Sequence, residues 1–148
     1  MTVDIQTYTE IISNELHIQK GKTEKILRTY VKQCSLNLLQ GNPITIPNIC
    51  TICSDTTSNT FITNGYIINL ISKELGVSVV MVSETINKLF EHIHTDLLNN
   101  NTVLLRGLCK LEPVYDKETN SFTVHVTKTT ALRGTDLMIH TCKWIKQK

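Results

Sequence analysis

The residues of this sequence that could most readily do chemistry are cationic. Five lysine and arginine side chains fall within thirteen consecutive positions in the first half of the chain. This density of positive charge can neutralise the backbone phosphates of a nucleic acid. A solvated helix face has the same composition, so both interpretations stay open. The cluster consists of Lys20, Lys22, Lys25, Arg28 and Lys32.

A second set of cations lies near the end of the chain. Its first four members lie in or beside strand-like segments and could meet phosphates from one side of a small sheet, or they could be ordinary surface charge. The lysines of the tail could contact phosphates too, or could complement the dipole of a final helix. The set consists of Arg106, Lys110, Lys128 and Arg133, followed by Lys143, Lys146 and Lys148 in the tail.

Cysteine and histidine provide a weaker signal. The five cysteines are odd in number and irregularly spaced, which predicts reduced thiols in a cytosol-like compartment. Cys50 and Cys53 have the C-x-x-C spacing, but a zinc site needs four ligands, and no second cysteine pair or nearby histidine pair has the right spacing. Cys109 alone adds too little. His92 and His94 lie two positions apart and so fall on different faces of a helix. We therefore expect buried thiols and no metal site.

Composition and motifs exclude several classes of function. The sequence has no glycine-rich phosphate loop and no Gly-x-Ser-x-Gly motif, which argues against an enzyme and against a cofactor. No apolar run is long enough for a membrane span, and the N-terminus has no signal-peptide character. The formal net charge of +2 permits an anionic partner without requiring one. We expect a cytoplasmic protein without a membrane partner.

The first half of the chain predicts two helices followed by short strands. Apolar residues recur at three- and four-residue steps over residues 4–17 and 23–40. Short extended segments follow at 44–52, where Pro47 points to an edge or a bend. A returning strand is expected at 60–63, after a polar turn.

The second half repeats the two helices. One helix begins at Tyr66 and is ended by Gly76, which suits a left-handed cap. Ser78 can cap the N-terminus of the next helix, which reaches Asn99.

A strand with Arg106-Gly107 in its middle is expected over 103–111, and a hairpin over 113–128 turns at the sequence DKETN. A short final helix is expected to open at 133–135 and to reach Trp144 and Ile145.

Sliding the chain against itself by fifty-nine positions reveals an internal repeat. Two identical pairs are Glu15 with Glu74 and Cys50 with Cys109. The apolar stripe of the first long helix also falls on that of the second. Chance matches between two amphipathic helices are common, but the turns and the following strand recur as well. The sequence therefore predicts a duplicated unit with a boundary at Asn64-Gly65.

The order of these elements resembles the bacterial histone-like HU and integration host factor family. In that family the strand after the long helix reads Gly-Phe-Gly-polar-Phe, and here residues 107–111 read Gly-Leu-Cys-Lys-Leu after Arg106. Cys109 departs from the second glycine. The segment 132–137 is similar to the family's entry into its last helix, with Thr135 where a lysine is usual. The resemblance covers most of residues 66–146 and, more faintly, 8–63.

The resemblance implies an interlocked dimer that here would be formed within one chain. Family members also clasp DNA with two long basic arms tipped by a proline. In this sequence the hairpin of the second copy carries Asp116 and Glu118 at its tip and has no proline. The hairpin expected in the first copy turns at SDTTSN, without a basic residue. We therefore expect any DNA to be bound by the body of the protein. The first copy of the repeated unit has diverged further from the family, since Asn48 stands where the strand glycine is expected and no final helix follows.

A helix-turn-helix is an alternative interpretation of residues 70–90, with Ser78 opening a recognition helix. The exposed face of that helix would carry Glu84, Lys88 and Glu91 and is not basic. A base-reading helix is therefore the less favoured interpretation.

The sequence thus predicts an α+β fold of two tandem histone-like units, residues 1–64 and 65–148, which form an intramolecular pseudodimer. The expected function is non-catalytic, architectural binding of double-stranded DNA in a prokaryotic or viral genome. The protein would lie at the nucleoid or, if viral, in the host cytoplasm. The alternative is a histone-like fold repurposed as a protein-interaction or assembly module. The predicted DNA-contacting residues are Lys20, Lys22, Lys25, Arg106, Lys110, Lys128, Arg133, Lys143 and Lys146.

Overall fold

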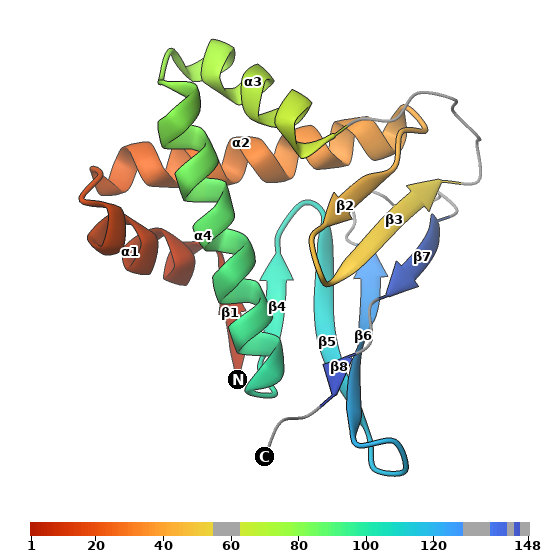
Figure 1. Ribbon diagram of the computed structural model, residues 1–148. Coiled ribbons are helices and arrows are strands. Elements are labelled where there is room, and N and C mark those ends of the chain that lie inside the picture. Colours follow the sequence, from red (N-terminus) through yellow and green to blue (C-terminus); the bar gives the residue numbers. More distant parts are fainter. Residues whose placement is uncertain (55–62, 129–136, 142–143, 146–148) are drawn as a thin grey trace.

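A computed structural model of the chain describes residues 1–54, 63–128, 137–141 and 144–145 (Figure 1). We call residues 1–54 the N-terminal half and residues 63–128 the C-terminal half. Each half contains a short helix followed by a long one, as the apolar spacing predicts. The helices are α1 (Ile5–Leu16), α2 (Lys20–Leu39), α3 (Asn64–Leu75) and α4 (Val79–Leu98).

Side-chain caps fix where the helices begin. The Asp4 carboxylate accepts the N–H of Thr7 at 3.2 Å, and the Ser78 hydroxyl accepts that of Met81 at 3.1 Å. Thr63 caps α3 in the same way, so the predicted boundary at Asn64-Gly65 lies within the first turn of this helix. Gly76 ends α3 with φ +66°, which confirms the predicted left-handed cap.

The strands of the described residues form two sheets. One has the order β1-β4-β5-β6-β8 and the other the order β2-β3-β7. All pairs among these strands are antiparallel except β1 with β4. The strands are β1 (Thr2–Asp4), β2 (Ile44–Ile46), β3 (Cys50–Ser54), β4 (Thr102–Leu105), β5 (Cys109–Asp116), β6 (Ser121–Lys128), β7 (Leu137–Thr141) and β8 (Trp144–Ile145).

The prediction of one strand over 103–111 was wrong, because the chain reverses at Arg106-Gly107-Leu108. The Leu108 N–H donates to the Leu105 carbonyl at 2.9 Å, which closes a tight turn between β4 and β5. Gly107 has φ +98°, a conformation that disfavours any side chain. The hairpin predicted after it is present as β5 and β6, and its turn lies between Asp116 and Ser121.

The predicted final helix was also wrong in the described residues. Residues 137–141 and 144–145 are strands β7 and β8, and β7 pairs with β3 along five residues. An unpaired β3 would leave a row of unbonded backbone groups at a sheet edge, which pairing with β7 satisfies. The returning strand predicted at 60–63 lies mostly outside the described residues, and Thr63 is the cap of α3.

The element bounds recur at the offset seen in the sequence. Helices α1 and α3 begin fifty-nine positions apart and each has 12 residues, and α2 and α4 do the same with 20 residues each. Left-handed residues recur at this offset too: Asn48 (φ 64°) corresponds to Gly107, and His17 (φ 55°) to Gly76. The two halves therefore share one backbone plan through the first strand turn.

The halves share one hydrophobic core. Helix α1 packs on α2 and α4, and α3 packs on α4 and α2, so each short helix touches both long ones. Figure 1 shows α2 and α4 crossing between α1 and α3. Fully buried side chains of both halves, such as Tyr8, Leu27, Ile71 and Leu89, belong to a single cluster. Among the described residues, no helix is long and apolar enough to cross a bilayer.

Candidate nucleic-acid interface

The first predicted basic cluster lies along α2. Lys22 and Lys25 are exposed, and both line a cavity of about 500 Å³ together with the end of α3 and the turn that follows it. Neither has an ion-pair partner among the described residues. These two ammonium groups are therefore available to an anion such as a phosphate. The other lining residues are Gln19, Gly21, Glu74, Leu75 and Val77.

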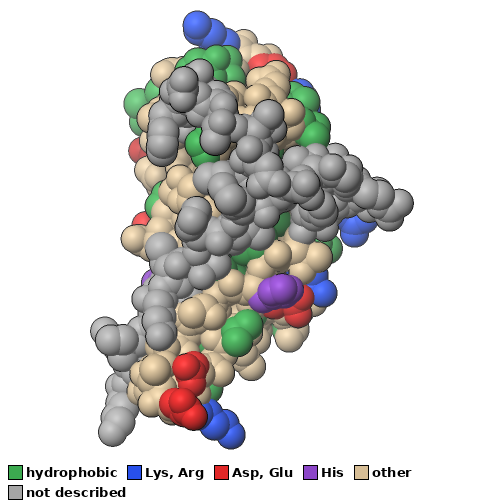
Figure 2. Space-filling view, turned by 90° about the vertical axis from the view of Figure 1, so that its right-hand side faces the viewer, with side chains coloured by type: hydrophobic (Ala, Val, Ile, Leu, Met, Phe, Trp, Pro, Cys, Tyr) green, Lys and Arg blue, Asp and Glu red, His purple; other side chains and the backbone are tan. Residues whose placement is uncertain are grey.

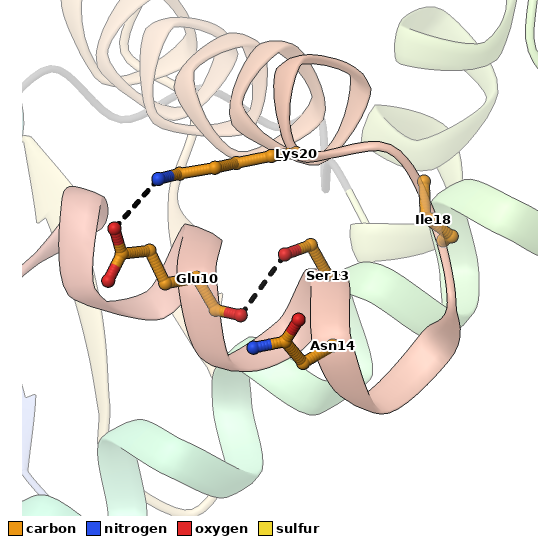
Figure 3. Close-up of a pocket in the computed structure, with 5 residues that line it drawn as sticks. All are labelled: Glu10, Ser13, Asn14, Ile18 and Lys20. Carbon is orange, nitrogen blue, oxygen red and sulfur yellow. Dashed lines mark hydrogen bonds and ion pairs between the residues drawn. The ribbon is translucent and has the colours of Figure 1, made fainter.

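Lys20 lies at the start of α2 but turns back towards α1. Figure 3 shows its ammonium paired with the carboxylate of Glu10, at 2.7 Å, beside a cavity of about 380 Å³. Ser13 donates its hydroxyl to the Glu10 carbonyl at 3.1 Å on the same side. Both charged groups of the pair are more than half exposed, so the pair is screened and adds little stability. The carboxylate nevertheless offsets the charge that Lys20 would present to a phosphate.

The rest of this cluster is neutralised as well. The Arg28 guanidinium contacts Glu24 at 2.8 Å along the helix, and Lys32 contacts Glu74 of α3 at 3.0 Å. The structure therefore splits the five cations into two that are available, Lys22 and Lys25, and three that are held by carboxylates.

The second predicted set is partly described. Arg106 is exposed on the turn between β4 and β5, and Lys110 is half-buried on β5. The Lys110 ammonium lies 3.6 Å from the Glu112 carboxylate, a loose contact that water screens. Lys128 ends β6 opposite Cys109, and its side chain lies outside the described residues, as do Arg133, Lys143 and Lys146.

Helix α2 holds the turn that carries Arg106. The Ser35 hydroxyl donates to the Gly107 carbonyl, and a Cβ added at Gly107 would lie 3.7 Å from Val31. Sequence reasoning missed this positioning role of Ser35, because a serine within an apolar helical stripe gives no local signal of a long-range partner.

The pair Lys22 and Lys25 is separated along α2 from the turn that carries Arg106. Lys22 lies thirteen residues before Ser35, which is about 20 Å along a helix axis. The structure thus places Lys22 and Lys25 together, places Arg106 and Lys110 on one hairpin, and keeps these pairs apart. In Figure 2 the described lysine and arginine side chains are likewise scattered near the margins of the face shown.

The helix-turn-helix interpretation has no basic surface to support it. The stripe of α4 that includes Val82, Ile86 and Leu89 is buried in the core. The start of this helix exposes Val79 and Val80, which are apolar.

The described thiols are core residues. Cys34, Cys50 and Cys109 are buried, and burial raises the pKa of Cys34 to about 12 and that of Cys109 well above its usual value. The protonated thiol is a poor nucleophile and a poor metal ligand. His92 is held by Glu15, with Nε2 2.5 Å from the carboxylate oxygen. The described residues contain no cluster of side chains suited to hold a metal.

Residues 62–131 match the family model described as bacterial DNA-binding protein, a segment that includes α3, α4 and strands β4 to β6. A comparison with curated proteins gave no match.

Proposed function

We propose that this chain is an architectural protein that binds duplex DNA, because residues 62–131 match the family model described as bacterial DNA-binding protein and the order of elements resembles that of histone-like HU and integration host factor. The binding we propose is non-catalytic, uses phosphate contacts and has little sequence preference. The family match carries this proposal, because it spans both helices and all three strands of the C-terminal half. A cytoplasmic location at the nucleoid, or in the host cytoplasm for a viral protein, belongs to the same proposal.

The chain in this proposal is a pseudodimer of two tandem units, 1–64 and 65–148. Three observations support it: the recurrence of helix bounds at fifty-nine positions, the matching left-handed turns, and the packing of α1 on α4 and of α3 on α2. Joining two units in one chain removes the entropic cost of association and lets each copy diverge.

Binding in this proposal uses the body of the protein. The available cations Lys22 and Lys25 form one contact group, and Arg106 with Lys110 forms the other. Their separation of about 20 Å along α2 is comparable with six base pairs of duplex at 3.4 Å per step. The acidic ribbon tip argues against insertion between bases, which the family achieves with apolar wedges. The other expected contacts with DNA phosphates stay predictions, and they are Lys20, Lys128, Arg133, Lys143 and Lys146.

Charge-reversal variants test this proposal. We would compare Lys22→Glu/Lys25→Glu with Arg106→Glu/Lys110→Glu and with the control Lys73→Glu/Lys88→Glu, because each pair changes the net charge equally. Affinity for a fluorescent duplex would be measured by anisotropy at low salt, against unrelated competitor duplexes.

We expect both test variants to lose affinity at least tenfold, since each lost phosphate contact weakens binding to any sequence. The control should change far less, and unrelated duplexes should compete equally. Absence of binding by the unmodified chain at low salt, or equal losses in all three variants, would contradict the proposal. The first outcome would favour the protein-interaction module.

A further inference from the structure

The cavity beside the start of α2 has an apolar wall that DNA binding leaves unexplained. Leu75, the last residue of α3, and Val77 line this cavity of about 500 Å³ together with the available lysines Lys22 and Lys25. A DNA backbone presents charged phosphates, which would use the lysines but not the apolar wall. A protein segment with both carboxylates and apolar side chains would use both parts of the cavity.

Exposed apolar residues follow this wall at the start of α4. Val79 and Val80 are 46% and 66% exposed. The fold does not require apolar side chains there, because the corresponding residues of the N-terminal half, fifty-nine positions earlier, are Lys20 and Gly21. Apolar area left in water is unfavourable, so these side chains favour contact with another protein. We call the cavity together with Val79 and Val80 the α2–α3 corner.

The β5–β6 ribbon has the complementary composition. Val114 and Asp116 are exposed and fall on one face of β5, because side chains alternate along a strand. Glu118 in the turn is exposed as well, and its N–H donates to the Asp116 carboxylate at 2.9 Å. Neither carboxylate has an ion pair with another described residue. Lys117 lies between the two carboxylates, so the end of the ribbon keeps a net negative charge beside its apolar area.

The ribbon is too far away to reach the corner of its own molecule. In Figure 1 the ribbon turn lies at the lower end of the molecule, whereas α2 begins on the left-hand side. Figure 2, turned about the vertical axis, shows acidic side chains gathered at the same lower end. Contact between the two surfaces must therefore join two copies of the chain. Such head-to-tail contacts leave a free ribbon and a free corner, so they can continue from copy to copy.

We propose that the α2–α3 corner is the docking site of the β5–β6 ribbon of a second copy of this chain. The charge complementarity between the two lysines and the two carboxylates, together with the apolar residues on both surfaces, supports this choice of occupant. The end of a ribbon buries less area than a standard interface, so the association is weak and depends on concentration. Docking withholds Lys22 and Lys25 from DNA, but the association does not rest on the proposed function.

Exchanging the charges of the two surfaces tests the docking without DNA. The corner variant is Lys22→Glu/Lys25→Glu and the ribbon variant is Asp116→Lys/Glu118→Lys, and all four positions are exposed. The weight-average mass of each protein would be measured by sedimentation equilibrium at low salt, over about 10 to 500 μM, a range suited to weak association. An equimolar mixture of the two variants would be measured in the same way, because each variant then meets a surface of opposite charge.

We expect the mass of the unmodified chain to rise with concentration by about 1.5-fold or more, and less as salt is raised. Each variant alone should keep the mass of a single chain, since like charges then face each other, and the mixture should regain the rise. The control Lys73→Glu/Lys88→Glu changes the net charge as the corner variant does and should associate like the unmodified chain. A constant mass of the unmodified chain, equal association of all the proteins, or a mixture that stays monomeric would overturn the docking. Duplex binding is not involved in any of these outcomes, so they are independent of the proposed function.

Discussion

The N-terminal and C-terminal halves share their helices and differ in how their sheets are completed. In the C-terminal half, the third strand β6 follows β5 directly through the ribbon turn. In the N-terminal half, the chain passes from β3 to α3, and the third position beside β3 is taken by β7 from the far end of the sequence. The two sheets therefore obtain their third strands from different places in the sequence, one from the adjacent segment and the other from the far end of the chain.

The halves also differ in the contacts that join them. Glu15 and Glu74 occupy corresponding positions, yet Glu15 contacts His92 and Glu74 contacts Lys32. The Tyr8 hydroxyl of the N-terminal half donates to the Asp96 carboxylate of the C-terminal half at 2.7 Å. At the equivalent positions with the two halves exchanged, the residues are Ile67 and Asn37. Equivalent positions are thus used with different chemistry, as expected when two units in one chain are free to diverge.

The largest effect is expected from disrupting β7, the strand from the far end of the sequence that pairs with β3. In Met138→Pro/Ile139→Pro, two backbone N–H groups of β7 are removed, so the strand can no longer pair regularly with β3. We expect the free energy of unfolding to fall by about 3 kcal/mol, from the loss of several backbone hydrogen bonds. Urea unfolding measures this loss. The control Met138→Val/Ile139→Val keeps good strand formers, and an equal loss in both variants would argue against a role for the pairing.

The two strand turns give the next comparison. Gly107→Val forces a β-branched side chain into φ +98° and should cost about 1–3 kcal/mol. Asn48→Gly changes the corresponding turn, where φ is 64°, and should stay within about 0.5 kcal/mol. Thermal unfolding of the two variants distinguishes them. Similar melting temperatures would mean that the turns do not differ in their need for glycine.

The contact between Tyr8 and Asp96 is expected to matter somewhat less. Tyr8→Phe removes a donor to a charged acceptor and should lower stability by about 1.5 kcal/mol. The pKa of Tyr8 is raised by its burial and then by its bond to Asp96, so the hydroxyl is protonated and able to donate throughout the neutral range. Tyr30→Phe is the counterpart, since its hydroxyl donates to the neutral side chain of Asn64 at 3.1 Å, and it should cost about 1 kcal/mol. A larger loss of stability in Tyr30→Phe than in Tyr8→Phe, measured by urea unfolding, would contradict the comparison.

The smallest effect is expected at the exposed ion pair between the halves. Glu74→Gln removes the charge that Lys32 faces and should cost about 0.2–1 kcal/mol, less as salt is raised. Glu24→Gln, which changes a pair within α2, is the matched control. A loss that is independent of salt would show that packing, and not charge, is responsible.

Local patterns in the sequence predicted the helical part of the fold well. The apolar spacing located all four helices of the described residues to within three positions at each end, and Ser78 and Gly76 marked their caps. These features succeed because a cap or an apolar stripe is encoded by residues within one or two turns of each other.

Long-range pairing could not be predicted in the same way. The pairing of β7 with β3 depends on residues more than eighty positions apart, and nothing in residues 137–141 indicates which strand edge they would meet. The turn at Gly107 was missed because apolar residues continue on both sides of it, which is typical of one strand. For the candidate site, the sequence identified the cations but not which of them are held by carboxylates such as Glu10 and Glu74.

The salt dependence of duplex binding tests the central claim most directly. The equilibrium constant of the full chain with a duplex of about 20 base pairs would be measured from 50 to 200 mM salt, with the two charge-reversal variants alongside. We predict that log K falls linearly with log salt with a slope of about −3 to −4 or steeper, because Lys22, Lys25, Arg106 and Lys110 contribute about 0.9 each and every further predicted contact adds to the slope. The slope should be shallower by about 2 in Lys22→Glu/Lys25→Glu and in Arg106→Glu/Lys110→Glu. No binding at 50 mM salt, or one slope for all three proteins, would contradict DNA binding by these residues.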